Sequence, residues 1–111
     1  MATSFNYVQG DTGPQIRLLL TNDDTNTPTN LTGATATLHF RAAGATTVLF
    51  SRLLYINPSN ATAGEAILQW QTTDLNQVAG VYEGEVEVVK AGGLRETLYE
   101  TLRFRIREDF A

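Results

Sequence analysis

Apolar and polar residues alternate with a period of two along most of this 111-residue chain. Near its end, arginines separate Leu102, Phe104 and Ile106, and glutamates separate the apolar residues of 82–88. Successive side chains of a β-strand point to opposite faces, so each run predicts a strand with one buried face. The predicted strands cover residues 16–20, 36–41, 48–56, 66–70, 82–88 and 102–107, preceded by a short strand near 5–8.

The segments between these runs have the composition of turns. Polar loops are predicted at 22–30 (NDDTNTPTN) and 57–64 (NPSNATAG), and tight hairpins at 42–45 and 91–93. Residues 72–80 (TTDLNQVAG) alone have a helical pattern. Thr73 or Asp74 would cap one short helical turn near 73–79, and Gly80 would end it.

About seven short strands separated by regular turns predict an all-β protein, an immunoglobulin-like antiparallel β-sandwich. We expect an N-terminal arm at 1–9 and a single sandwich domain at 10–111. In such sandwiches a tyrosine near the start of a late strand donates a hydrogen bond back across the corner, and Tyr82 is the candidate. The cysteine pair of antibody domains is absent, because Gly84 stands where the second cysteine would be.

Composition narrows the classes of function. The net charge of −4 disfavours nucleic acid as a partner, because phosphate binding requires a basic surface. The chain has no cysteine, which excludes disulfides and thiolate metal sites and favours folding inside a cell. No apolar run approaches the ~20 residues of a membrane helix, and the N-terminus lacks the pattern of a signal peptide. We therefore expect neither a nucleic acid nor a membrane as partner.

The stretch GDTGP at 10–14 contains Asp11-Thr12-Gly13, the triplet of aspartic proteases. A retroviral-type protease would need this aspartate buried, sharing a proton with a second copy across a dimer axis. Gln9 and Gly10 are unsuited to a buried approach, and Pro14 restricts the residue before it. Val78-Ala79-Gly80 meets the later signature of that family only loosely. The favoured interpretation is a turn leading into a strand at 15–21.

Other catalytic or metal sites are weakly indicated. His39 is the single histidine and is predicted to be a solvated residue on the polar face of its strand. The acidic loop 22–26 has alternating oxygen ligands, but Thr27 and Gly33 occupy EF-hand positions that require Gly and Glu. An irregular calcium loop is the alternative to a polar turn there. We predict no catalytic residues, no metal and no cofactor.

Two rows of like charge are the most informative polar feature. If their strands are neighbours, the rows could lie close together on one exposed face. Such a face either fixes strand register in solvent or docks onto a partner subunit with matching charges. The rows consist of Glu83, Glu85 and Glu87 and of Arg103, Arg105 and Arg107.

The order of several short motifs resembles the immunoglobulin-like domain at the N-terminus of phage baseplate upper proteins, together with related small virion proteins of tailed phages. The resemblance covers about residues 9–109. Its carriers are Gly10-Asp11-Thr12-Gly13, Leu31-Thr32-Gly33-Ala34, Gly80 with Tyr82, and Gly93-Leu94-Arg95-Glu96-Thr97. The baseplate proteins continue into a long fibre-forming or receptor-binding part that this sequence does not contain, which favours a free-standing adaptor or decoration protein.

This resemblance implies a non-enzymatic structural role in a virion assembled in the host cytoplasm. The implied partners are the major capsid protein or tail and baseplate proteins, with further copies of the chain in a homo-oligomeric assembly. The predicted interface comprises both charge rows, and the chain ends, which could extend and pair with a neighbour. Its N-terminal contributors are Phe5 and Tyr7.

The alternative function is a carbohydrate-binding β-sandwich module. It would require two or three exposed aromatic rings on one face of the sandwich. Tyr55 and Tyr99 are candidates for exposure, whereas Trp70 alternates with the apolar residues of its strand and is predicted to lie in the core.

Overall fold

The computed structural model describes residues 3–22, 27–98 and 101–110. Its elements in chain order are β1 (Thr3–Val8), β2 (Ile16–Leu19), β3 (Thr35–Ala42), β4 (Phe50–Leu53), η1 (Pro58–Ala63), β5 (Glu65–Leu68), β6 (Gly80–Val89), β7 (Arg95–Thr97) and β8 (Leu102–Arg107). The all-β class and the sandwich are confirmed, with each strongly alternating run forming a strand.

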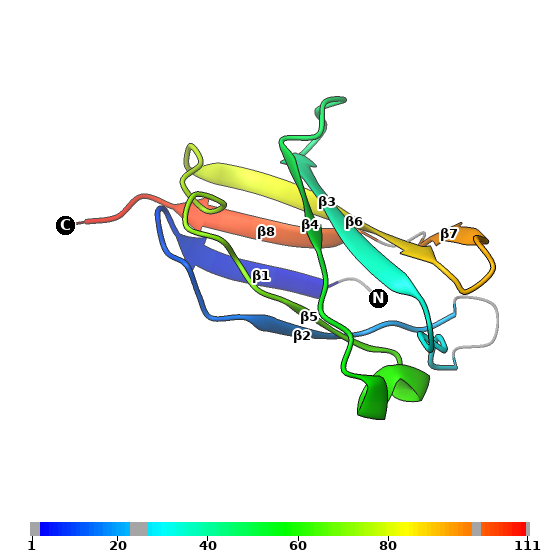
Figure 1. Ribbon diagram of the computed structural model, residues 1–111. Helices are drawn as coiled ribbons and strands as arrows, with labels where there is room; N and C mark the ends of the chain where they lie inside the picture. Colours follow the sequence, from blue (N-terminus) through cyan, green and yellow to red (C-terminus); the bar gives the residue numbers. More distant parts are fainter. Residues whose placement is uncertain (1–2, 23–26, 99–100, 111) are drawn as a thin grey trace.

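The strands form a large and a small layer (Figure 1). The large sheet has the order β1-β8-β6-β3-β4, and β7 pairs with the far end of β6. Adjacent strands of this sheet are antiparallel, except that β1 and β8 run parallel to each other. The small sheet pairs β2 with β5. The chain after β4 leaves the large sheet, and Tyr55 pairs with Ile67 of β5, which links the two layers.

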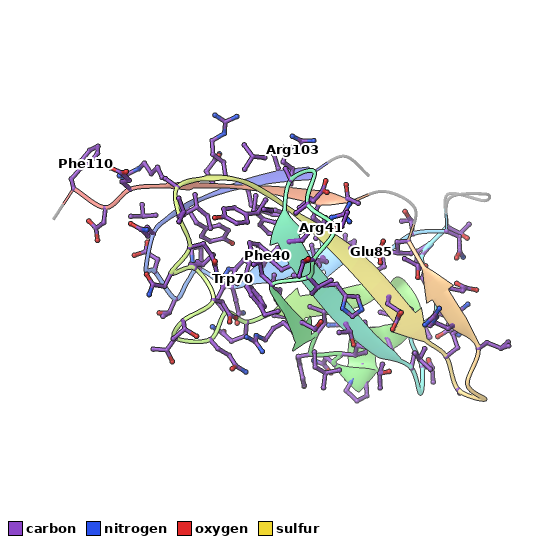
Figure 2. The ribbon with its side chains drawn as sticks, turned by 90° about the horizontal axis from the view of Figure 1, so that it is seen from above. Phe40, Arg41, Trp70, Glu85, Arg103 and Phe110 are labelled. Carbon is purple, nitrogen blue, oxygen red and sulfur yellow. The ribbon has the colours of Figure 1, made fainter. Side chains whose placement is uncertain are left out.

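Aromatic rings fill the space between the layers. Phe40 stacks on Tyr82 with ring centroids 5.2 Å apart and meets Trp70 edge-on at 6.0 Å. Figure 2 shows Phe40 and Trp70 among the interior side chains, which confirms Trp70 as a core residue. Gly84 leaves room for this cluster, because a Cβ there would lie 2.7 Å from Leu38 and 2.9 Å from Phe104. Close packing therefore requires glycine at the position where antibody domains have a cysteine.

The corner tyrosine is also confirmed. The hydroxyl group of Tyr82 donates a hydrogen bond to the backbone oxygen of Val78. Burial raises the pKa of this hydroxyl above its ordinary value. The bond fixes the loop that leads into β6, as expected for an immunoglobulin-like corner.

The helix lies elsewhere than predicted. Residues 72–76 form hydrogen-bonded turns, in which Asp74 and Asn76 donate backbone hydrogen bonds three residues back. The carboxylate of Asp74 accepts from the backbone N–H of Gln71, which precedes it, and from Arg52, whereas a helix cap would accept from N–H groups that follow it. The described helix is η1, in a segment predicted to be a loop. Asn57 caps it and Pro58 occupies its first turn, a combination that favours a helix start.

Residues 3–8 are an integral strand rather than an extended arm. β1 pairs with β8 along its whole length. Tyr7 is buried against Trp70 with ring centroids 5.2 Å apart, and Phe5 stacks on Phe104 at 5.6 Å. Both side chains thus pack within the chain, which leaves little of Tyr7 exposed, and their contact with a partner stays a prediction. Their alternation with Ser4 and Asn6 is itself the pattern of a half-buried strand.

Candidate docking face on the large sheet

The large sheet has one face against the core and one face exposed. We call the exposed side the outer face. Cross-strand register places the outward side chains of five neighbouring strands on it. The charged and histidine side chains of the outer face are Glu83, Glu85 and Glu87 of β6, Arg103, Arg105 and Arg107 of β8, and His39 and Arg41 of β3.

The two charge rows belong to neighbouring strands, as predicted, but they do not lie side by side. Glu83 is opposite Arg103, and the β6–β8 ladder ends at the next pair, Gly84 with Leu102. Because the strands are antiparallel, the rest of the glutamate row extends away from this point in one direction and the rest of the arginine row in the other. The outer face consequently has an acidic half and a basic half that meet at the Glu83–Arg103 pair.

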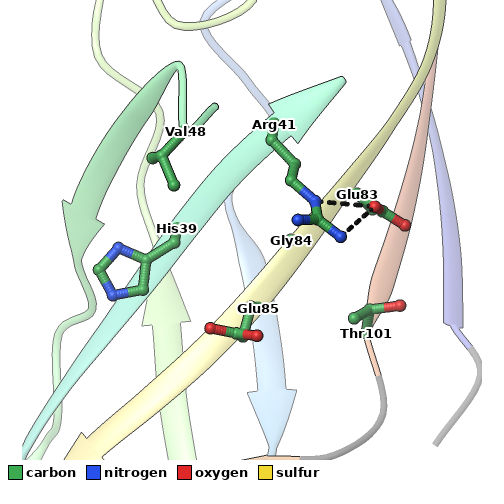
Figure 3. Close-up of a pocket in the computed structure, with 7 residues that line it drawn as sticks. All are labelled: His39, Arg41, Val48, Glu83, Gly84, Glu85 and Thr101. Carbon is green, nitrogen blue, oxygen red and sulfur yellow. Dashed lines mark hydrogen bonds and ion pairs between the residues drawn. The ribbon is translucent and has the colours of Figure 1, made fainter. Parts of the chain in front are cut away.

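Two of the glutamates are paired within the chain. Glu83 accepts a hydrogen bond of 2.8 Å from Arg41, as Figure 3 shows. Glu87 lies 3.5 Å from Arg95 and 3.9 Å from the ring nitrogen Nε2 of His39. The predicted exposure of both charge rows is confirmed in β8, where all three arginines are exposed, whereas Glu83 and Glu87 are half-buried.

Three charges of the outer face have neither an ion pair nor a side-chain hydrogen bond within residues 3–22, 27–98 and 101–110. They are Glu85 in the acidic half and Arg103 and Arg105 in the basic half. Arg107 differs, because it donates to the backbone oxygen of Glu108 and its guanidinium lies 4.6 Å from the ring centre of Phe110. The unpaired charges are thus of both signs and are all exposed.

Two shallow depressions lie on this face. One, of about 50 Å³, lies between β3, β6 and the start of β8 and is lined by His39, Arg41, Glu83 and Glu85 among others (Figure 3). The other, of about 270 Å³, is lined by Asn6, Tyr7, Val8, Arg105 and Arg107. Both are smaller than the ~300–1,000 Å³ typical of small-molecule pockets. The outer face is therefore suited to a broad partner surface rather than to an enclosed ligand.

The β3–β4 hairpin brings His39 beside Ser51, a contact that reasoning from the sequence did not find. Nδ1 of His39 lies 2.7 Å from the hydroxyl oxygen of Ser51. With Glu87 this resembles the residue types of a Ser-His-acid triad. However, the 3.9 Å between the histidine and the carboxylate exceeds the ~2.6–3.2 Å needed to orient the ring. His39 and Ser51 lie directly opposite each other in the β3–β4 hairpin, so a correct prediction of the strand pairing would have revealed their contact.

The GDTGP stretch is a turn, as the favoured interpretation predicted. The backbone N–H of Asp11 donates to Val8 and that of Gly10 donates to Leu75. The side chain of Asp11 is exposed, whereas the protease alternative requires a buried carboxylate.

Metal and membrane sites receive no support from the described residues. Among them, no cluster of three or more His, Asp or Glu side chains could hold a metal ion. Residues 23–26 of the alternative calcium loop lie outside the described residues. Nor does the described part of the chain contain a helix with the length and apolar character to cross a membrane.

Two further ion pairs serve the fold. Arg52 of β4 contacts the carboxylate of Asp74, which is almost fully buried. Arg17 of β2 contacts Glu65 of β5 across the small sheet. Hydrogen bonds from Arg17 and then Asn60 lower the pKa of Glu65 below its ordinary value.

Comparison with known proteins provides a fold and no family. No protein-family model matches the sequence, and no curated protein is significantly similar to it. Among solved structures, the chain is similar to CopC from Methylosinus trichosporium OB3b, with a TM-score of 0.50 and 9% sequence identity. The similarity covers 94% of this chain and 84% of CopC. At this identity it supports the β-sandwich fold alone.

Proposed function

We propose that this chain is a non-enzymatic structural protein of a tailed-phage virion. It would act as an immunoglobulin-like adaptor or decoration module on the capsid, tail or baseplate, docking through the outer face of its large sheet. Its partners would be other virion proteins and further copies of itself, assembled in the host cytoplasm.

The observation that carries this proposal is the division of the outer face into acidic and basic halves. Exposed charges of both signs that lack a partner within the described residues are suited to recognising a surface with complementary charges. Charge complementarity of this kind fixes orientation and excludes wrong partners more than it adds affinity. Such behaviour suits a module whose role is to occupy one defined position in a symmetric assembly.

The assignment to a phage rests on the sequence motifs. Their order resembles the N-terminal domain of baseplate upper proteins, and Tyr82 makes the corner hydrogen bond that the resemblance to an immunoglobulin-like domain implies. The sandwich is compatible with this role but is shared by many unrelated functions. The docking face therefore supports a binding module, while the motifs supply its context.

The carbohydrate-binding alternative has weaker support. Trp70 is buried and cannot act as a sugar platform. Tyr55 is exposed, but Tyr99 lies outside the described residues. A single exposed tyrosine falls short of the set of rings on one face that stacking of a sugar would require.

Quantitative mass spectrometry of purified particles of the source phage tests the proposal. The copy number of this chain is measured against that of the major capsid protein. Near parity indicates a decoration protein of the capsid, and a small fraction indicates an adaptor in the tail, neck or baseplate. Absence from the particles would refute the virion role. A glycan array run in parallel would then test the carbohydrate-binding alternative.

A further inference from the structure

We infer that the outer face binds the outer face of a second copy of this chain, face to face about a two-fold axis. The axis would cross the strands near the Glu83–Arg103 pair, so that the basic half of each copy covers the acidic half of the other. This inference rests on the proposed docking role and names one partner for it.

The spacing of the unpaired charges makes the face self-complementary. Glu85 lies two residues along β6 from Glu83. Arg105 lies two residues along β8 from Arg103, in the opposite direction across the face. Each step is ~6.6–6.8 Å, so the two charges are equally distant from the proposed axis. A two-fold rotation about that axis therefore brings Arg105 of one copy near Glu85 of the other.

The remaining sideways offset is small. β6 and β8 are adjacent strands, ~4.8 Å apart, and a long arginine side chain can span that distance. A two-fold axis repeats every contact, so each dimer would contain two Arg105–Glu85 pairs. Arg107 and Glu87 lie one further alternate residue out on their strands, which places opposite charges at the ends of the contact as well.

The expected association is weak. A patch of five strands with edges of roughly 20 Å covers about 400 Å² per copy, about half of what stable interfaces bury per partner. Exposed ion pairs are also screened by salt. We therefore expect a dimer that forms at high protein concentration and low ionic strength, conditions that a crowded virion surface approximates in local concentration.

A charge exchange between two variants tests the inference. Arg105→Glu makes the basic half acidic, and Glu85→Arg makes the acidic half basic. Both side chains are exposed and lack an ion pair within the described residues, so neither change should unfold the protein. The control is Lys90→Glu, which alters net charge as much as Arg105→Glu but lies beyond Val89, at the far end of β6.

Sedimentation equilibrium at low salt, up to ~1 mM protein, gives the dissociation constants. We expect the native chain and Lys90→Glu to dimerise alike. Each of the other variants alone should bind at least about tenfold more weakly, since the altered contact occurs twice. An equimolar mixture of the two should recover association, because every altered charge then faces its opposite.

Three results would overturn the inference: a native chain that stays monomeric at ~1 mM, self-association of Arg105→Glu or of Glu85→Arg like that of the native chain, or an equimolar mixture of these two variants that recovers nothing. Loss of association in Arg105→Glu but not in Glu85→Arg is a case of the second result, and it would indicate a contact that does not use the acidic half. Particle mass spectrometry separates the two proposals. A chain present in virions but monomeric in solution keeps the docking role and loses the second copy as partner.

Discussion

The chain uses charged residues in two different ways, and the contrast separates fold from function. Asp74 in a turn and Glu65 in β5 are buried carboxylates, each paired with an arginine from a strand distant in the sequence. On the outer face, Glu85, Arg103 and Arg105 are exposed and have no ion pair in the described part of the chain. The buried carboxylates form ion pairs within the chain, whereas the exposed charges are available to a partner.

The difference shows where to look for binding on a face whose two described depressions are smaller than typical ligand pockets. A charge that is buried and paired stabilises the fold by avoiding the cost of an unpaired buried ion. A charge that is exposed and unpaired contributes little to stability and can be changed without unfolding the protein. Substitutions in the two sets should therefore affect different measurements.

The largest effect is expected for Asp74→Ala. The substitution leaves the backbone N–H of Gln71 without its acceptor and the guanidinium of Arg52 without its partner. Because Arg52 retains some contact with water, we expect a loss of about 2–4 kcal/mol in the free energy of unfolding, at or below the range for breaking a buried ion pair. Urea denaturation measures it. Asp11→Ala, at an exposed turn aspartate, is the matched control and should change stability by less than ~0.5 kcal/mol.

If Asp74→Ala and Asp11→Ala were equally mild, the distinction between the two sets of charges would fail. The turn at 71–76 would then be held by its backbone hydrogen bonds alone.

A smaller, pH-dependent effect is expected at Glu65. Its pKa is lowered in the folded chain by Arg17 and Asn60, so its contribution to stability is present above its unfolded pKa of about 4.5. That contribution is lost as the pH falls through the folded pKa. Glu65→Gln removes the titrating group while keeping similar size.

Urea denaturation between about pH 2.5 and 7 measures this effect, and the curve of the Glu65→Gln variant should slope less steeply below pH 4.5 than that of the native chain. Glu85→Gln is the control and should reproduce the native slope if the titration of Glu65 is responsible. Identical slopes for all three proteins would show that the Arg17–Glu65 pair has no influence on acid stability.

Alternation alone predicted most of the strands. β3, β6 and β8 begin and end within two residues of the predicted runs. A strand with one buried face has apolar and polar residues in alternation, and this pattern can be seen directly in the sequence. The strand predicted at 48–56 is shorter in the structure: β4 ends at Leu53, and Tyr55 pairs with the other sheet. β7 is short and wholly exposed, so its sequence has no such alternation and did not predict a strand.

Long-range contacts explain what the sequence could not predict. Where a helix was expected near 73–79, the carboxylate of Asp74 binds Arg52, more than 20 residues away, instead of capping the residues that follow it. The arrangement of the charge rows depends on the register between β6 and β8. A tight hairpin between these two strands would have fixed that register, but the long segment 90–101 between them does not. Core packing sets the register instead, because Tyr82 lies opposite Phe104 and Gly84 lies opposite Leu102.

The smallest effect on stability, and the clearest effect on assembly, is expected for the combined change of Arg103, Arg105 and Arg107 to Glu. All three side chains are exposed, and Arg103 and Arg105 have no ion pair within the described residues, so the free energy of unfolding should fall by no more than about 1 kcal/mol. The change makes the basic half of the outer face acidic, however. Incorporation into particles should therefore fall strongly when phage with this substitution are grown and their chains counted by mass spectrometry. Circular dichroism and urea denaturation check that the variant is folded. A folded variant that enters particles at the native copy number would show that docking uses another surface, and the unpaired charges would then be no more than the solvated exterior of a sheet.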